Sequence, residues 1–260
     1  MTTTRVAIVT GAARGLGAEI ALRLSADYDA LVLADLSAEH PERESDPRWQ
    51  EVDADVVPIA CDVRDAAAVS AMFDTAAEAG ALCGLVNTAG TGLFTPLVEI
   101  DQQLWDNTFA VNARGTFLTC QELVKRADGP AAIVNIASIG ARLGNEMLTH
   151  YGASKAAVIE LGHSVARSGA LREIRCNTVL PGLILTDMWR QTIAWLRGRD
   201  SSLDGVSDND VFAGFVQQMV PMGRPQSAGD IAEMVAFLLS DKARNVTGQS
   251  IAVDGGAVMS

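Results

Sequence analysis

The chain has 260 residues, of which 48% are hydrophobic, and a formal net charge of −12. This length allows one large α/β core and leaves too few residues for a clear second domain. The acidic balance argues against nucleic acid as a partner, because phosphate binding requires a basic surface. No N-terminal stretch is apolar and long enough for a signal peptide or a membrane span, so we expect a cytoplasmic protein without a membrane partner.

The four cysteines lie far apart, and each sits in or beside an apolar run: Cys61, Cys83, Cys120 and Cys176. They form no Cys-x-x-Cys pair, and the three histidines do not join them in a ligand pattern. We therefore expect buried free thiols, a reducing compartment and no metal site.

Short β-rich runs alternate with longer helical patterns along the chain. Most of the β-rich runs are apolar throughout, which is typical of parallel strands covered on both faces. They are Val6–Thr10, Ala30–Ala34, Val56–Cys61, Leu85–Asn87, Ala131–Ala137, Cys176–Leu180 and Ser250–Val253. The helical patterns are Gly15–Ser25, Ala66–Ala79, Gln102–Arg126, His150–Arg167 and Ala228–Leu239. The alternation predicts a single-domain α/β fold over residues 1–260, with a doubly wound, Rossmann-like parallel sheet whose ligand edge lies at the strand ends.

Two stretches interrupt this rhythm. Ser37–Asp55 is acidic, contains two prolines and has little periodicity, so we expect the helix there to be short or absent. Thr186–Gly223 is long, contains Trp189 and Trp195, and lies between the sixth strand and the last helix. A long insertion at the ligand edge is often a helical substrate lid. The alternative is a packed helical pair that completes the fold, and one element can be both.

A glycine-rich turn joins the first strand to the first helix. It reads Thr10-Gly11-Ala12-Ala13-Arg14-Gly15-Leu16-Gly17, with the spacing G-x-x-x-G-x-G rather than G-x-G-x-x-G. Glycines let the backbone turn sharply and approach a ligand, and the helix N-terminus offers free amides to a pyrophosphate. Such a turn alone could be only a tight loop, but its place between an apolar strand and a helix favours a dinucleotide cofactor.

Asp35 ends the second strand, close to the offset of about 20 residues at which an acidic residue holds a ribose 2′-hydroxyl. A carboxylate there repels a 2′-phosphate and so favours NAD over NADP. Arg14 opposes this, because a cation in the glycine turn can reach that phosphate, but Leu36 supplies no second cation. We therefore predict NAD. Asp62, after the third strand, could accept the adenine amino group, cap the next helix, or do both.

Tyr151-Gly152-Ala153-Ser154-Lys155 lies in the helical pattern His150–Arg167, and Ser138 lies thirteen residues before the tyrosine. The spacing Tyr-x-x-x-Lys places a phenol and an ammonium on one helix face, one turn apart. The positive charge favours the phenolate and lowers the phenol pKa from its usual value of about 10, while the serine hydroxyl could hold a substrate oxygen. Alone, this spacing is more often part of a solvated helix face. The functional interpretation therefore depends on the other motifs of the chain.

Together and in this order, the glycine turn, Asp35, Asp62 and the pair Tyr151/Lys155 resemble the short-chain dehydrogenase/reductase family, from about Arg5 to Gly256. Further stretches match the family's patterns: Asn87-Thr88-Ala89-Gly90, Asn112, Pro181-Gly182-Leu183-Ile184-Leu185-Thr186 and Val253-Asp254-Gly255-Gly256. Thr88 stands where the family has a second Asn, which puts one hydrogen bond to the sheet or the cofactor in doubt.

The resemblance implies an NAD-dependent short-chain alcohol dehydrogenase/ketoreductase. Tyr151 would be the general base in alcohol oxidation and the general acid in ketone reduction. Lys155 would lower the pKa of Tyr151, Ser138 would orient the substrate oxygen, and Asn112 would hold a water in a proton relay. The implied cofactor contacts are Gly11, Arg14, Gly15, Leu16, Gly17, Asp35, Asp62, Val63, Asn87, Ala89, Gly90, Tyr151, Lys155, Pro181, Gly182, Ile184 and Thr186.

The substrate is less clear from the residues. Pro181–Trp189 resembles the acetoin reductase, butanediol dehydrogenase and polyol dehydrogenase branch of the family, in which Met-Trp often follows the Pro-Gly turn. Met188 and Trp189 would then contact a small vicinal diol, hydroxyketone or polyol held by Ser138 and Tyr151. The alternative is that these two side chains anchor the lid to the core.

Other functions stay open. A 3-oxoacyl thioester reductase, acting on an acyl carrier or CoA, shares nearly all the motifs but usually prefers NADP. On a carrier protein it needs a basic docking face, for which the local candidates are Lys125, Arg126, Arg172 and Arg175. A bulkier cyclic or aromatic alcohol is another possible substrate, and a non-catalytic NAD-binding regulator is a remote alternative. Relatives are commonly tetramers, so we expect a homotetramer.

Overall fold

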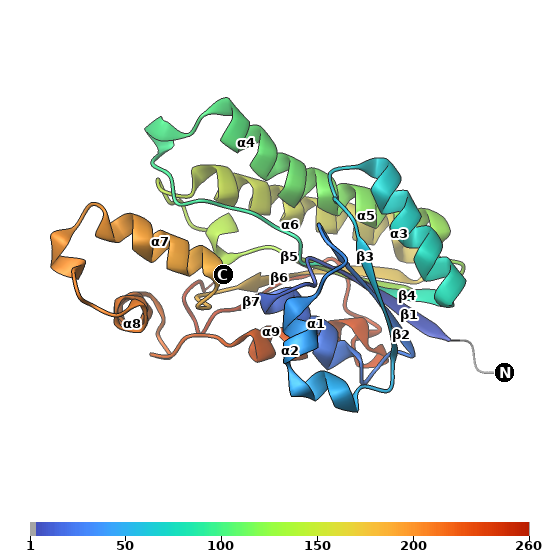
Figure 1. Ribbon diagram of the computed structural model, residues 1–260. Helices are drawn as coiled ribbons and strands as arrows, with labels where there is room; N and C mark the ends of the chain where they lie inside the picture. The colour runs from blue at the N-terminus through green and yellow to red at the C-terminus, as the bar shows by residue number, and fades with distance from the viewer. Residues whose placement is uncertain (1–3, 260) are drawn as a thin grey trace.

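Seven parallel strands form one sheet in the order β3-β2-β1-β4-β5-β6-β7 (Figure 1). The structure, a computed structural model, describes residues 4–259. The strands are β1 (Arg5–Thr10), β2 (Ala30–Asp35), β3 (Asp55–Ala60), β4 (Ala81–Asn87), β5 (Ala131–Ile136), β6 (Ile174–Pro181) and β7 (Ser250–Val253). The strand order reverses between β1 and β4, which is where a doubly wound sheet binds its ligand. The predicted doubly wound parallel sheet is confirmed.

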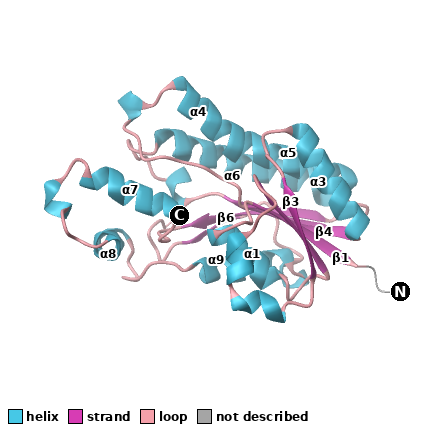
Figure 2. Cartoon of the chain, in the orientation of Figure 1, coloured by secondary structure: helices cyan, strands magenta, loops and turns pink. Residues whose placement is uncertain are grey.

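Helices cover both faces of the sheet (Figure 2). They are α1 (Gly15–Leu24), α2 (Pro41–Ser45), α3 (Ala66–Ala79), α4 (Gln102–Phe109), α5 (Thr116–Arg126), α6 (Thr149–Gly169), α7 (Asp187–Arg197), α8 (Asp208–Met219) and α9 (Ala228–Leu239). On one face lie α3, α5 and α6, and on the other lie α1 and α9 (Figure 1). Within residues 4–259, no helix is long and apolar enough to cross a membrane.

The continuous apolar run of β1 follows from this double cover. Val6 and Ile8 are buried with side chains of α3, α5 and α6, whereas Ala7 and Val9 are buried with those of α1 and α9. Successive residues of a strand point to opposite faces, so both sets of positions must be apolar. Each fully buried aliphatic side chain of this size stabilises the fold by roughly 1.5–3 kcal/mol.

The predicted helix Gln102–Arg126 is interrupted in the structure. A π-helical turn, Ala110–Gly115, separates α4 from α5. A Cβ atom on Gly115 would lie 2.7 Å from Val63 Cγ2, so the absence of a side chain lets this turn pack closely on the loop after β3. The predicted helical segment Gln102–Arg126 is thus present, with a π-helical turn in its middle that carries Asn112.

The two irregular stretches have the expected character. Between β2 and β3 lie only the short α2 and a 3₁₀ turn, Pro47–Glu51. The stretch Thr186–Gly223 forms the helical pair α7 and α8. Ile193 of α7 and Phe212 of α8 are buried with Leu180 of β6 in one apolar cluster. The helices α7 and α8 are thus packed on the sheet, as expected for a helical pair that completes the fold.

Candidate active site

Tyr151 and Lys155 lie one turn apart near the start of α6. The Lys155 ammonium is 5.8 Å from the centre of the Tyr151 ring and donates a 2.8 Å hydrogen bond to the carbonyl oxygen of Ile136, the last residue of β5. Lys155 is only 4% exposed. The predicted pairing of phenol and ammonium on one helix face is present in the structure.

Ser138 meets this pair from the loop that follows β5. It follows β5 by two residues and caps a short 3₁₀ turn, where its hydroxyl accepts a 3.0 Å hydrogen bond from the amide of Gly140. The same hydroxyl is hydrogen-bonded to the Tyr151 phenol. Three of the four predicted catalytic side chains, Ser138, Tyr151 and Lys155, therefore meet at the carboxyl edge of the sheet.

The acid–base properties of the pair differ from the expectation. Burial raises the pKa of Tyr151 above its ordinary value, and the hydrogen bond from Ser138 lowers it by less. Burial also lowers the pKa of Lys155 to about 8. The expected lowering of the Tyr151 pKa by Lys155 is not found, because burial disfavours the charged forms of both groups.

Asn112 is fully buried in the π-helical turn and fastens two segments of the site. Its amide nitrogen donates to the carbonyl oxygen of Thr91 at 2.8 Å and to the hydroxyl of Ser154 at 2.9 Å. Its amide oxygen accepts from the amide of Thr91 at 2.8 Å. Ser154 in turn donates to the carbonyl oxygen of Tyr151 at 2.7 Å. Neither Ser154 nor Thr91 was a predicted site residue, although Ser154 lies between Tyr151 and Lys155 in the Tyr-x-x-x-Lys motif.

Two glycines after β4 leave room for the catalytic side chains. A Cβ atom on Gly90 would lie 3.2 Å from the Lys155 ammonium and 3.4 Å from the amide oxygen of Asn112. A Cβ atom on Gly92 would lie 2.5 Å from Cδ2 of the Tyr151 ring. Gly92 was not among the predicted site residues, because its role depends on a close approach that no local motif encodes.

The glycine turn has the geometry of a phosphate-binding loop. Gly11 has φ +65°, and a Cβ atom there would lie 2.8 Å from the main chain of Ala89. A Cβ atom on Gly17 would lie 2.0 Å from the carbonyl oxygen of Gly11, so the turn and the start of α1 are in direct contact. A Cβ atom on Gly15, which has φ +58°, would meet nothing within 4 Å, and Leu16 beside it packs on the core. These features fit a dinucleotide phosphate at the N-terminus of α1.

Asp35 lies at the carboxyl end of β2, beside the glycine turn. Its carboxylate accepts hydrogen bonds from the amide of Ala13 at 2.9 Å and from its own neighbour Leu36 at 2.8 Å. The side chain is thus held where an acidic residue meets a ribose in this fold. Arg14 is directed elsewhere, since its guanidinium lies 3.8 Å from the carboxylate of Asp187, the first residue of α7.

Asp62 and Val63 follow β3. The Asp62 carboxylate is bound by the guanidinium and the amide of Arg64, at distances between 2.6 and 3.0 Å, and this hydrogen bonding lowers its pKa. The cap of α3 is Asp65, which accepts from the amide of Ala67, so the capping alternative for Asp62 is wrong. Val63 is buried against the π-helical turn.

Asn87, at the end of β4, braces the sheet rather than facing an open site. Its amide nitrogen donates to Asn135 of β5 at 2.9 Å, and its amide oxygen accepts from Thr119 of α5 at 2.7 Å. The amides of Thr88 and Ala89 both donate to the Thr10 hydroxyl. The Thr88 hydroxyl, where the family has an Asn side chain, is buried without a hydrogen-bond partner among the described residues.

The turn after β6 packs against the C-terminal segment. Pro181 pairs with Val253 of β7, and the amide of Gly182 donates to the carbonyl oxygen of Val253. A Cβ atom on Gly182 would lie 2.8 Å from Cα of Asp254, so this position requires glycine for packing alone. Ile184 packs on the core cluster that contains α1, and Thr186 is the N-cap residue of α7.

Beside Tyr151 lies a cavity of about 280 Å³. Its walls come from the loop after β4 and from α7: Gly92, Leu93, Phe94, Thr95, Glu99, Met188, Gln191 and Trp195. The predicted substrate residue Met188 lines it. Trp189 instead packs against α8, with its ring centre 5.2 Å from that of Phe212 and 5.3 Å from that of Phe215. Trp195 contributes the aromatic wall, with its ring 5.8 Å from Phe94.

The described residues contain no group of three or more His, Cys, Asp or Glu side chains arranged to hold a metal ion. The four cysteines are free thiols, three of them buried.

The chain is similar to known oxidoreductases over nearly its whole length. The family model described as Enoyl-(Acyl carrier protein) reductase matches residues 11–258. D-threitol dehydrogenase of Mycolicibacterium smegmatis is 36% identical, over 97% of this chain and 92% of that protein. A 3-oxoacyl-[acyl-carrier-protein] reductase of Staphylococcus aureus is also 36% identical, over 100% of both chains. L-2,3-butanediol dehydrogenase of Corynebacterium glutamicum is 33% identical, over 97% and 98%.

A solved structure agrees with this similarity. L-sorbose reductase from Gluconobacter frateurii, complexed with NADPH and L-sorbose, superposes with a TM-score of 0.90. The match covers 99% of this chain and 98% of that chain, at 26% sequence identity.

Proposed function

Because the chain belongs to the short-chain dehydrogenase/reductase family, whose members include threitol and butanediol dehydrogenases, we propose that it is an NAD(H)-dependent oxidoreductase that interconverts a secondary alcohol and a ketone. The proposed substrate is a small diol, hydroxyketone or polyol. The observation that carries the proposal is the meeting of Ser138, Tyr151 and Lys155 beside the glycine turn and a small cavity.

When bound, the nicotinamide accepts or supplies the hydride, and the side chains manage the proton. In oxidation, the Tyr151 phenolate accepts the hydroxyl proton of the substrate alcohol, and in reduction the phenol returns a proton to the carbonyl oxygen. The Ser138 hydroxyl, already hydrogen-bonded to the phenol, holds the substrate oxygen beside it. The Lys155 ammonium stabilises the phenolate once it forms, and Asn112 fixes the loop that faces the ammonium.

The preference for NAD is supported by charge at the ribose end. Asp35 presents a carboxylate there, and Arg14 is directed toward Asp187. A bound 2′-phosphate would therefore face a like charge without a dedicated cation. The related sorbose reductase binds NADPH, so the family fold itself does not decide between the two cofactors.

Two observations support a small substrate over a carrier-bound acyl thioester. The cavity of about 280 Å³ is slightly smaller than the usual range of about 300–1,000 Å³ for ligand sites. The basic residues considered for carrier docking lie at the amino edge of the sheet, away from Tyr151. Their side chains already form hydrogen bonds or ion pairs within the protein. Arg175 donates to the carbonyl oxygens of Leu238 and Ser240, and Arg126 pairs with Asp74 and Glu122.

The proposal also includes a cytoplasmic homotetramer. Trp105 and Phe109 stack on α4 with their ring centres 4.8 Å apart, and Trp105 and Phe117 are exposed by 38% and 43%. Aromatic side chains are enriched at interfaces, which supports association through this face. Light scattering of the purified protein that shows a monomer at micromolar concentration would reject the tetramer.

The direct test is NADH oxidation, followed by absorbance, with diacetyl, acetoin, a ketose and an acetoacetyl thioester, and each positive reaction repeated with NADPH. We expect turnover with the diketone or the ketose and a higher kcat/KM with NADH. Turnover only with the thioester would replace the proposed substrate class with acyl reduction. A higher kcat/KM with NADPH would overturn the cofactor assignment.

A further inference from the structure

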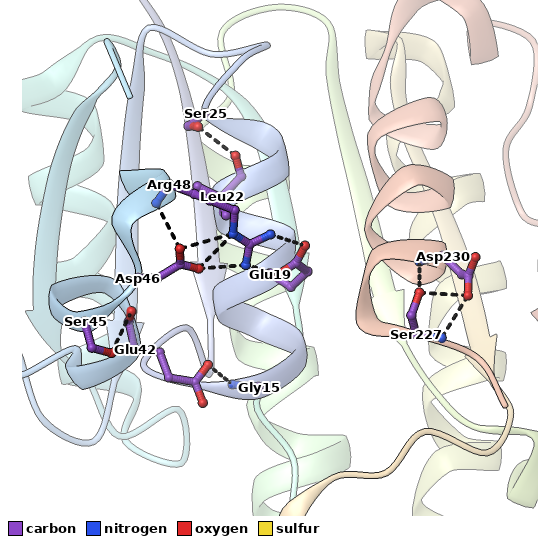
Figure 3. A network of polar contacts seen from close by, with 10 residues as sticks. All are labelled: Gly15, Glu19, Leu22, Ser25, Glu42, Ser45, Asp46, Arg48, Ser227 and Asp230. Carbon is purple, nitrogen blue, oxygen red and sulfur yellow. Dashed lines mark hydrogen bonds and ion pairs between the residues drawn. The ribbon is translucent and has the colours of Figure 1, made fainter. Parts of the chain in front are cut away.

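A carboxylate from α2 caps the glycine turn. The Glu42 carboxylate accepts a 2.6 Å hydrogen bond from the amide of Gly15, the first residue of α1 (Figure 3). The N-cap residue Arg14 makes no side-chain hydrogen bond to the helix. The first amides of a helix require partners from outside the helix, and here one partner comes from 27 residues further along the chain.

The segment that carries Glu42 is fastened to α1 at a second point. We call residues 41–51, which comprise α2 and the following 3₁₀ turn, the strap. Arg48 of the strap binds both carboxylate oxygens of Glu19 on α1, at 3.0 and 2.8 Å (Figure 3). Asp46 binds the same guanidinium at 2.7 Å and caps the turn. The strap is anchored at Glu19, one helical turn beyond Gly15. This second contact keeps the exposed Glu42 side chain next to the Gly15 amide.

Glu42 and Asp35 therefore face the same short loop. Asp35 binds the amide of Ala13 and Glu42 binds that of Gly15, two residues later. Both amides are oriented toward negative charge, and both are already bound by carboxylates of the protein. Asp35 lies at the ribose position of this fold, so a 2′-substituent there would lie close to both carboxylates.

The cations of this region are directed away from that position. Arg14 lies toward Asp187, the Arg43 guanidinium lies over the ring of Trp49, and Arg48 is bound by Glu19 and Asp46. His40 precedes the strap, and burial lowers its pKa, so its imidazole is neutral at pH 7. A phosphate at the ribose would therefore face two carboxylates, and Arg14, whose side chain is 73% exposed, is paired with Asp187 at 3.8 Å instead.

We propose that Glu42 is a specificity-determining residue that acts with Asp35 to exclude a 2′-phosphate from the adenosine end of the cofactor site. The inference rests on the proposed function, since it supplies a second residue for the proposed preference for NAD. Glu42 acts on the 2′-phosphate through its negative charge and through occupation of the Gly15 amide.

The test compares two ligands that differ only by the 2′-phosphate, adenosine 5′-monophosphate and adenosine 2′,5′-bisphosphate, by calorimetric titration of the whole protein. Glu42→Gln removes the charge, and its amide oxygen still accepts from Gly15, so the cap of α1 is retained. Glu44→Gln is the matched control, because it removes the same charge from α2 at a residue that points about 200° away. Thermal unfolding of each variant checks that the fold is intact.

In Glu42→Gln we expect the affinity for the bisphosphate to rise about fivefold relative to the monophosphate, the size typical of one exposed charge pair. Glu44→Gln should leave this ratio unchanged. The inference is overturned if the two variants change the ratio equally, which would show a general charge effect. It is also overturned if Glu42→Gln tightens both ligands equally, which would show that Glu42 only blocks the loop.

A failure of the proposed function gives a different result. If the wild-type protein has a higher kcat/KM with NADPH than with NADH, the preference for NAD is wrong whatever Glu42 does. If the wild type prefers NADH and Asp35→Ser weakens that preference while Glu42→Gln does not, the NAD assignment stands and only the role of Glu42 is rejected.

Discussion

The Lys155 ammonium donates a 2.8 Å hydrogen bond to the carbonyl oxygen of Ile136. Within the described part of the chain it makes no ion pair, and the residue is only 4% exposed. A backbone carbonyl compensates the loss of water around an ammonium only in part. Burial therefore lowers the pKa of Lys155 to about 8.

This shift predicts a pH-dependent cost to stability. The pKa of Lys155 is about 8 in the folded protein, whereas an ordinary lysine, as in the unfolded chain, has a pKa of 10.5. Between pH 8 and pH 10.5 the unfolded chain therefore holds the proton more strongly than the folded protein does. Through this residue, the free energy of unfolding rises with pH from about 8 to 10.5. Lys155→Met should remove this rise and increase stability at pH 7 by up to about 3 kcal/mol.

The measurement is denaturant unfolding of the cofactor-free protein at a series of pH values. Burial also raises the pKa of Tyr28 to about 12 and that of Cys61 to about 11, and these two groups make the free energy of unfolding fall as pH rises. The difference between wild type and Lys155→Met removes their contribution and leaves that of Lys155. Lys125→Met, at an exposed lysine of α5, is the control. An identical pH dependence in wild type and Lys155→Met would contradict the prediction.

Tyr151→Phe tests the proton transfer itself. The variant lacks the phenolic oxygen that accepts the proton, so we expect turnover to fall by about 10²–10⁴-fold while NADH still binds, as measured by nucleotide fluorescence. Because burial raises the pKa of Tyr151, wild-type alcohol oxidation should accelerate with pH through the alkaline range, where the phenolate forms. Retained activity in the variant would remove Tyr151 from this role.

Gly92→Ala tests how closely the Tyr151 ring is positioned. The added Cβ would lie 2.5 Å from ring carbon Cδ2, and the backbone of Gly92 is not in the left-handed region, so the effect is purely steric. We expect kcat to fall by about 10²-fold, as small misplacements of reacting groups cost this much. Gly129→Ala, where a Cβ meets open space, should keep full activity. Equal kcat for both variants would show that the ring has room to move.

Much of the fold and the centre of the site follow from local patterns. The two-sided apolar run of β1 is visible in the sequence because both faces of the strand are covered. Tyr151 and Lys155 are brought together by a single helix, and Ser138 follows the end of a strand whose edge that helix meets. These three side chains come together through the regular geometry of one helix and one strand, which the residue spacing is enough to predict.

The remaining details depend on contacts between distant segments. The π-helical turn that buries Asn112 is stabilised by packing of Gly115 on Val63, which no helix propensity reports. Trp189 and Trp195 lie six residues apart on α7, so they project from different sides of the helix. Only the packing of α7 decides that Trp195 faces the cavity and Trp189 faces α8.

Thr88→Val tests the departure from the family's Asn-Asn-Ala-Gly pattern. Among residues 4–259 the buried Thr88 hydroxyl has no hydrogen-bond partner, and its replacement by a methyl group of similar shape removes the cost of desolvation. We expect the free energy of unfolding to rise by about 1 kcal/mol in denaturant unfolding. Thr10→Val is the matched control and should destabilise, because the Thr10 hydroxyl accepts from the amides of Thr88 and Ala89. Destabilisation by Thr88→Val would show that the hydroxyl has a partner in solution.

The two tryptophans of α7 should separate substrate binding from stability. Trp195 lines the cavity between Phe94 and the Arg199 guanidinium, which lies 3.8 Å from its ring centre, so Trp195→Ala should raise the KM of the substrate about tenfold. Trp189 packs on Phe212 and Phe215, so Trp189→Ala should lower the free energy of unfolding by roughly 3 kcal/mol. Steady-state kinetics and denaturant unfolding of both variants provide the comparison. If Trp189→Ala alone changed KM and left stability intact, the substrate would bind on the side of α7 that the structure packs against α8.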